Sequence, residues 1–201
     1  LRLLVSGGAK LEPSVLWSLI GLGWEVRSGY GLAETASTFT GNLPGRERLE
    51  SEGKPFQQGA EVRIDRDVDA GEALPEGLGE ILLRGPCVFD GYLDDPDATA
   101  RALDGDGWLH TGDLGWLDAD GFLHVQGRVK EMIVLGGGKN VFPEPLEKHY
   151  AEADAIEEIA VLEKDGSLVA LVVPDREAIR RKAVTRADEA VRVALAERGR
   201  E

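Results

Sequence analysis

Two short motifs lie close together in the chain and carry its clearest chemistry. The first is Gly-Trp-Leu-His-Thr-Gly-Asp-Leu at 107–114, and the second is Gly-Arg-Val-Lys-Glu at 127–131. Asp113 and Arg128 therefore stand on either side of a short predicted hairpin. A carboxylate accepts hydrogen bonds from hydroxyls and a guanidinium donates to oxygens, so the pair could hold a ribose diol. A turn-capping role for Asp113 and a surface ion pair for Arg128 explain the same residues and stay open.

A second motif, Gly-Tyr-Gly-Leu-Ala-Glu-Thr at 29–35, follows a predicted strand. Glycines such as Gly31 let the backbone approach a ligand closely. Tyr30 could stack on a flat base, and Glu34 could bind a hard cation such as Mg²⁺ through oxygen. An ordinary strand-to-helix turn, with Glu34 as an acid of the first helical turn, is the alternative.

A third feature is the run Gly-Gly-Gly-Lys-Asn at 136–140. Consecutive glycines cost backbone entropy on folding, so we expect them to serve a purpose. A flexible loop, a phosphate cradle and a surface that slides past a narrow ligand are all compatible with them, and so is a simple hairpin loop.

Several other kinds of site are not indicated. His110, His124 and His149 show no metal-ligand spacing with one another or with Cys87. No Ser/His/Asp constellation stands out. The glycines at 21–23 lack the third glycine of a dinucleotide fingerprint, which argues against a Rossmann site.

Composition narrows the class of protein. The 201 residues allow one domain or two small ones, and 42% of them are hydrophobic, which is enough for a core. The net charge of -14 argues against nucleic-acid binding and against a polybasic lipid anchor in this portion. Cys87 is the only cysteine, which fits a reducing cytoplasm. We see no signal peptide and no transmembrane segment, and the first residues resemble a buried strand of a longer protein.

Hydrophobic periodicity predicts an α/β beginning, a β-rich middle and an α+β end. The beginning is a strand, a helix and a strand, and the middle is a small distorted β-barrel or antiparallel sheet. The end is a compact α+β unit with its boundary at 127–130. The expected strands are 2–5, 24–28, 60–65, 80–84, 114–117, 122–126, 131–135, 156–163 and 167–173, and the expected helices begin at Pro13 or span 95–103, 143–153 and 175–198.

Taken in order, these motifs resemble the adenylate-forming (AMP-binding) superfamily, which includes acyl-CoA synthetases, peptide-synthetase adenylation domains and luciferases. Each motif is weak alone, but five in the right order are specific. The resemblance covers residues 1 to about 174 and rests on 6–9, 30–34, 79–85 with 91–92, 108–114 and 127–147.

The resemblance implies a two-step reaction. A carboxylate attacks the α-phosphate of ATP, giving acyl-AMP and pyrophosphate, and a thiol, usually that of coenzyme A, then attacks the acyl carbon. Carried over by position, Tyr30 would stack on adenine, and Asp113 with Arg128 would hold the ribose. Glu34 would bind Mg²⁺ and take part in catalysis. The remaining nucleotide and acyl contacts would come from Gly7, Gly8, Ala9 and Gly31.

The resemblance also implies a domain division. Residues 1–127 would be the end of the large AMP-binding domain, 128–130 a hinge, and 131–201 a small mobile domain. Lys130 would be the hinge residue about which family members rotate the small domain between the half-reactions. Gly137 and Gly138 would lie in a loop that swings toward the pantetheine tunnel.

The segments 131–134 and 138–147 look like those of the long-chain acyl-CoA synthetase branch. We therefore expect a fragment of an AMP-forming fatty-acid–CoA ligase, with ATP, Mg²⁺ and coenzyme A as cofactors and cosubstrates. The sequence contains no Ser/Thr/Gly-rich phosphate loop and no copy of the family's C-terminal Pro-x-Thr-x-x-Gly-Lys motif, so we expect it to be inactive alone. Ala33 stands where the family usually has Thr or Ser, which removes one hydroxyl contact to phosphate. The alternatives are an acyl-AMP ligase that loads an acyl carrier protein and a stand-alone degenerate adenylate-binding module.

Overall fold

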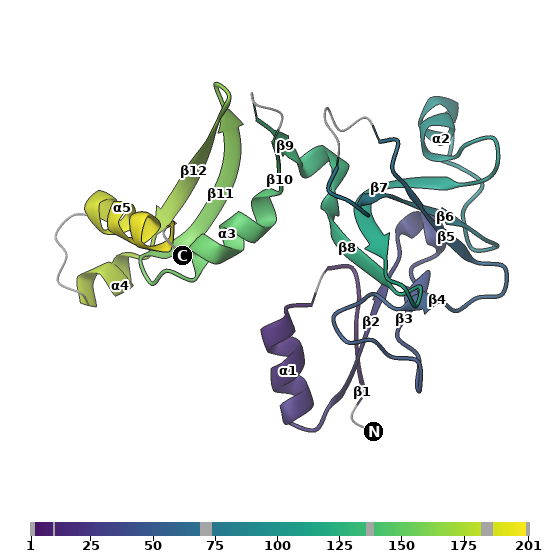
Figure 1. The fold of residues 1–201 in the computed structure, drawn as a ribbon, viewed down its shortest axis with the longest axis horizontal. Helices are drawn as coiled ribbons and strands as arrows, with labels where there is room; N and C mark the ends of the chain where they lie inside the picture. The colour runs from purple at the N-terminus through teal and green to yellow at the C-terminus, as the bar shows by residue number, and fades with distance from the viewer. Residues whose placement is uncertain (1–2, 10, 69–73, 136–138, 182–186, 200–201) are drawn as a thin grey trace. The chain divides into compact units, whose positions relative to one another are not determined.

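The computed structural model describes the chain except for residues 1–2, 10, 69–73, 136–138, 182–186 and 200–201 (Figure 1). The described residues form two compact units, and the division falls between Val129 and Lys130. The first unit contains most of the predicted nucleotide-binding residues.

The first unit begins with the predicted α/β arrangement. Strands β1 (Leu3–Ser6) and β2 (Glu25–Tyr30) are parallel, and α1 (Pro13–Gly21) connects them. Pro13 starts the helix, where its missing N–H has no intrahelical partner to lose. Two short antiparallel strands, β3 (Thr40–Gly41) and β4 (Lys54–Pro55), extend the sheet in the order β1-β2-β3-β4.

The middle of the chain is an open antiparallel sheet of four strands in the order β5-β6-β7-β8. Of the two forms expected for this region, the antiparallel sheet is confirmed and the closed barrel is not, because no pairing among the described residues joins β5 to β8. Helix α2 (Pro96–Ala102) precedes β7, and Asp95 caps its first turn. The strands are β5 (Glu61–Asp65), β6 (Gly79–Arg84), β7 (Leu109–Leu117) and β8 (Leu123–Arg128).

Strand β7 is longer than predicted, and this matters for the site. It begins at Leu109 and not at 114, so most of the motif at 107–114 is part of a strand. Alternate residues of its first half, Leu109, Thr111 and Asp113, are buried. Their side chains are therefore turned away from solvent. The core beside them contains Phe39, Ile81, Leu83, Leu109 and Leu123, each no more than 1% exposed.

The second unit is the expected α+β arrangement, with two corrections. The expected strand 131–135 is shorter, because Val129–Glu131 forms a 3-10 turn, η2, and leaves only β9 (Ile133–Val134). The single helix expected over 175–198 is represented by two described helices that contact each other. The other elements are β10 (Asn140–Val141), α3 (Pro143–Ala151), β11 (Ile156–Lys164), β12 (Ser167–Pro174), α4 (Arg176–Arg181) and α5 (Ala187–Arg198).

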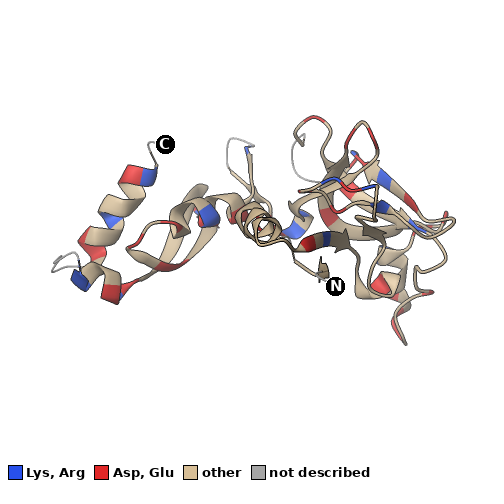
Figure 2. Cartoon of the chain, turned by 90° about the horizontal axis from the view of Figure 1, so that it is seen from below, with Lys and Arg blue, Asp and Glu red and all other residues tan. Residues whose placement is uncertain are grey.

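Charged residues occur throughout both units. Figure 2 shows acidic residues on helices, strands and loops of each unit, in keeping with 37 Asp and Glu against 23 Lys and Arg. None of the described helices combines the length and the apolar character that a bilayer crossing needs.

Candidate functional site

The structure brings Asp113 and Arg128 together, as predicted, and adds Tyr30. The register of β7 and β8 places Asp113 directly opposite Arg128. Arg128 forms an ion pair with Asp113, in which its Nε lies 3.1 Å from Oδ1. Tyr30, at the end of β2, donates its hydroxyl to Oδ2 of the same carboxylate at 2.6 Å. Asp113 is only 8% exposed, so both of its oxygens are held in a largely buried position.

Burial sets the electrostatics of this cluster. It raises the pKa of the Asp113 carboxyl, and the hydrogen bond from Tyr30 and the positive charge of Arg128 oppose that rise. Burial and the neighbouring Asp113 carboxylate raise the pKa of Tyr30, so the phenol remains a hydrogen-bond donor. The Arg128 side chain is 53% exposed, which leaves its guanidinium accessible to a ligand.

The backbone around Asp113 is also held in place. Thr111 donates its hydroxyl to the Ile81 carbonyl at 2.7 Å and accepts the Asp113 N–H at 3.0 Å. Glu80 accepts the Gly112 N–H at 2.8 Å. Sequence reasoning missed Thr111 and Glu80. Thr111 had a local signal, since it stands two residues before Asp113 in the same motif. For Glu80 no local signal exists, because only the pairing of β6 with β7 brings it there.

Glu34 lies on a short 3-10 turn, η1 (Ala33–Thr35), that follows β2. Tyr92 donates its hydroxyl to Glu34 Oε1 at 2.7 Å, and this hydrogen bond raises the pKa of Tyr92. Gly31 has a structural reason to be glycine, because a Cβ there would lie 1.8 Å from the Ser37 carbonyl oxygen. A ligand is not needed to explain Gly31.

The residues fit a magnesium ion that arrives with a nucleotide. Across the described part of the chain, no group of three His, Cys, Asp or Glu side chains is placed to hold a metal by itself. Mg²⁺ is usually held by one or two carboxylates together with phosphate oxygens and water. Glu34 could supply one such carboxylate.

Gly7, Gly8 and Ala9 follow β1 and are exposed. Gly8 has a φ of +84°, which favours glycine, and a Cβ on Gly7 would lie 3.5 Å from the Gly29 carbonyl oxygen. The turn therefore lies at the carboxyl ends of the parallel strands β1 and β2, where open α/β sheets bind ligands.

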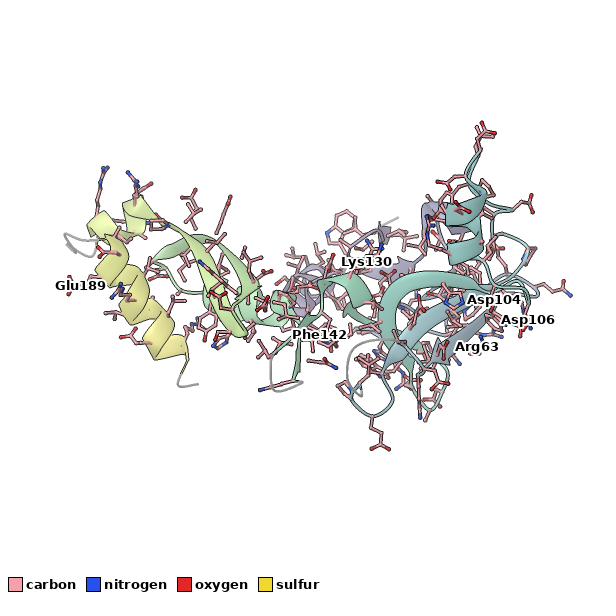
Figure 3. All side chains as sticks on the ribbon, turned by 90° about the horizontal axis from the view of Figure 1, so that it is seen from above. Arg63, Asp104, Asp106, Lys130, Phe142 and Glu189 are labelled. Atoms are coloured by element: carbon pink, nitrogen blue, oxygen red, sulfur yellow. The ribbon has the colours of Figure 1, made fainter. Side chains whose placement is uncertain are left out.

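The remaining predicted residues belong to the second unit. Lys130, labelled in Figure 3, is exposed on η2. Gly137 and Gly138 lie outside the described residues. A hollow of about 660 Å³ in this unit contains none of the predicted site residues. Apolar residues of α4 and α5 line it together with charged residues such as Glu189, which Figure 3 labels on α5.

The chain matches known proteins over most of its length. Residues 1–93 match the family described as AMP-binding enzyme. The chain is 44% identical over 142 residues to long-chain-fatty-acid–CoA ligase ACSBG1 of Bos taurus, which covers 71% of this chain and 19% of that protein. It is 40% identical over 180 residues to long-chain-fatty-acid–CoA ligase 6 of Homo sapiens, which covers 88% of this chain and 26% of that protein.

Solved structures give the same result. O-succinylbenzoate coenzyme A synthetase from Bacillus subtilis, in complex with ATP and magnesium ion, matches with a TM-score of 0.72 and 33% identity. The match covers 87% of this chain and 37% of that chain.

Fold, site and comparisons together place the chain in the adenylate-forming superfamily of AMP-binding enzymes. Within it, the chain is similar to AMP-forming CoA ligases, and the two sequence relatives quoted are long-chain fatty-acid–CoA ligases. The resemblance inferred from the motifs is thus confirmed. The chain spans about a fifth of the length of the bovine relative, 19%.

Proposed function

We propose that this chain supplies part of the nucleotide site of an AMP-forming ligase that joins a long-chain fatty acid to coenzyme A. The carboxylate of the fatty acid attacks the α-phosphate of ATP, and pyrophosphate leaves. The thiol of coenzyme A then attacks the acyl carbon, and AMP leaves. The observation that carries the proposal is the buried Asp113 carboxylate held between Tyr30 and Arg128.

In this proposal the residues of the first unit bind and orient the nucleotide. Asp113 accepts hydrogen bonds from the ribose hydroxyls, and the exposed guanidinium of Arg128 donates to ribose oxygens. Tyr30 holds Asp113 through its hydroxyl, and its ring would contact adenine as the family resemblance implies. The turns at Gly7–Ala9 and Gly31 border the base and the acyl group.

Glu34 would hold the magnesium ion that accompanies ATP. Bound there, the cation would neutralise charge on the phosphates during the first half-reaction. The Tyr92 hydroxyl orients the Glu34 carboxylate by donating to Oε1.

We further propose that residues 128–130 are a hinge, with Lys130 at its centre, between a large domain ending at 127 and a small domain at 131–201. The division of the described chain between Val129 and Lys130 supports this proposal. The Gly137 and Gly138 loop would then reach the coenzyme A path after rotation.

The two relatives quoted support a fatty acid as substrate and coenzyme A as acceptor, because both are named as fatty-acid–CoA ligases. Neither name supports transfer to an acyl carrier protein. Comparing coenzyme A with acyl carrier protein as acceptor, in an ATP-dependent assay with palmitate, tests this point on the protein that contains the whole ligase.

The ribose contact can be tested on the chain itself by calorimetric titration. We expect AMP to bind more tightly than 2′,3′-dideoxy-AMP, which lacks both hydroxyls. Asp113→Asn should weaken AMP binding roughly tenfold or more, since a hydrogen bond to a charged group contributes about 1.5–3 kcal/mol. Equal binding of the two nucleotides by the unmodified chain would contradict the proposed function.

A further inference from the structure

Glu80 lies next to the proposed ribose site but is not among the residues proposed to touch the nucleotide. It stands on β6, and its side chain is 14% exposed. One carboxylate oxygen accepts the Gly112 N–H at 2.8 Å, and the other lies 3.1 Å from Nδ1 of His110. The carboxylate therefore bridges a ring and a backbone amide that are both on β7.

The Gly112 amide lies in an irregular part of strand β7. Glu80 pairs with Leu114 and Leu82 pairs with His110, so β7 has two more residues than β6 over this stretch. Such a bulge interrupts the ladder and redirects the side chains beside it. Gly112 has a φ of +71° within it. Asp113 is the next residue, so the turn at Gly112 sets the direction of the Asp113 carboxylate.

Two anchors hold this bulge to β6. Thr111 is bound to the Ile81 carbonyl, and Gly112 is bound to the Glu80 carboxylate. His110 keeps the Glu80 carboxylate in place from the other side, and Nε2 of the same ring lies 3.8 Å from Oδ2 of Asp104. Figure 3 labels Asp104 in the first unit.

We propose that Glu80 is a positioning residue: by holding the Gly112 N–H, it aims the Asp113 carboxylate at the hydroxyls of a bound ribose. This inference rests on the proposed function and adds to it a residue that does not touch the nucleotide. Arg128 and Tyr30 hold the end of the Asp113 side chain, whereas Glu80 holds the backbone from which that side chain projects.

The test compares Glu80→Ala with Glu80→Gln by titrating AMP and 2′,3′-dideoxy-AMP. The alanine variant should bind AMP roughly tenfold more weakly, because a misdirected Asp113 loses hydrogen bonds made by a charged group. Its binding of the dideoxynucleotide should be unchanged, since that ligand has no hydroxyls for Asp113. Glu80→Gln should restore most of the AMP affinity, because its amide oxygen still accepts the Gly112 N–H.

Glu61→Ala is the matched control. Glu61 stands on the neighbouring strand β5, is 54% exposed in its side chain, and pairs with Arg84 and not with β7. It should leave the affinities for both nucleotides unchanged. An equal loss of both nucleotides in Glu80→Ala would show a general structural role and overturn the inference. Unchanged AMP binding in Glu80→Ala would also overturn it.

A measurement without nucleotide separates this inference from the proposed function. The ¹³C signal of the Asp113 side-chain carboxyl and the amide signal of Gly112 are followed by NMR in the same variants. Both should shift in Glu80→Ala and stay close to their original positions in Glu80→Gln and Glu61→Ala. An unmoved Asp113 signal in Glu80→Ala would refute positioning by Glu80, even if the unmodified chain failed to distinguish the two nucleotides.

Discussion

At the scale of single residues, Asp113 is the central residue of the proposed nucleotide site. A buried carboxylate is costly unless charged or hydrogen-bonding partners compensate it. Asp113 has both kinds, in the Arg128 guanidinium and the Tyr30 hydroxyl. The carboxylate is therefore held in one orientation before a ligand arrives, which lowers the ordering cost of binding.

The pKa of Asp113 gives a pH prediction. Burial raises it above its usual value, and only the ionised carboxylate accepts hydrogen bonds with both oxygens. AMP affinity should therefore fall as the pH decreases through this raised pKa, above the range near 3.9 where an exposed Asp titrates. Titrations of AMP across the acidic range check this, and an affinity independent of pH down to about 4 would contradict it.

The raised pKa of Asp113 affects stability in the opposite direction: AMP binding weakens at low pH, whereas the contribution of Asp113 to stability weakens at high pH. Between the unfolded and the raised folded pKa, the folded chain binds more protons than the unfolded chain. The contribution of Asp113 to the free energy of unfolding is thus fully present below the unfolded pKa. It is lost as the pH rises through the folded pKa. Urea denaturation at several pH values would show this as a free energy of unfolding that depends on pH differently in the chain and in Asp113→Asn.

Tyr30→Phe removes the hydroxyl but keeps the ring. The hydrogen bond from Tyr30 lowers the pKa of Asp113, so its loss should move the acidic decline of AMP binding to higher pH. We also expect a loss of about 1–3 kcal/mol in the free energy of unfolding, because a buried acceptor loses its donor. Tyr92→Phe is a suitable control, because its hydroxyl bonds Glu34 and not Asp113. An unchanged pH profile in Tyr30→Phe would contradict the assignment.

At the scale of secondary structure, turns and bulges decide where the chemical groups lie. The bulge in β7 redirects Asp113, and the turn after β2 carries Glu34. Regular strands and helices supply the frame that fixes both. Tyr30 is the last residue of β2 in the first sheet, and Asp113 lies on β7 in the second. The hydrogen bond between them therefore joins the two sheets of the first unit.

A substitution at Gly31 tests whether the turn after β2 has room for a side chain. Gly31→Ala places a Cβ 1.8 Å from the Ser37 carbonyl oxygen, so the backbone must move. We expect a loss of about 3 kcal/mol in the free energy of unfolding, as in overpacked cores. Gly21→Ala, at the end of α1 with no atom within 4 Å of its Cβ, should be neutral or stabilising by up to about 1 kcal/mol. Equal thermal denaturation midpoints for the two variants would disprove the constraint.

At the scale of the whole molecule, the chain contains two units with different proposed tasks. In the proposed function the first unit would bind and orient the nucleotide, and the second would supply the hinge residue and the glycine loop. A division at Val129 and Lys130 would let the second unit change its task between two half-reactions, provided that the hinge rotates.

We predict that the 201-residue chain does not form acyl-AMP by itself. It lacks a Ser/Thr/Gly-rich phosphate loop and the family's Pro-x-Thr-x-x-Gly-Lys motif, so the phosphates of ATP have no cationic partner of that kind. A coupled pyrophosphate assay with ATP, Mg²⁺ and palmitate should show no turnover above a protein-free control. Steady release of pyrophosphate by the purified chain would refute this expectation.

Local sequence determined several features of this protein. Pro13 begins α1 as predicted, and the turn between β7 and β8 sets Asp113 opposite Arg128, because a short hairpin couples residues that are near in sequence. The ordered motifs also identified the superfamily. These inferences succeeded because helical starts, hairpins and short motifs depend on neighbouring residues alone.

Only the tertiary structure decided how the site is completed. Tyr30 reaches Asp113 across 83 residues, and Glu80 reaches Gly112 across 32 residues. The open sheet in place of a barrel, and the bulge that turns Asp113, likewise follow from the pairing of distant strands. Local periodicity shows which face of a strand is apolar, but it does not state which strand pairs with which or in what register. The groups that aim the carboxylate therefore become visible only when the chain is folded.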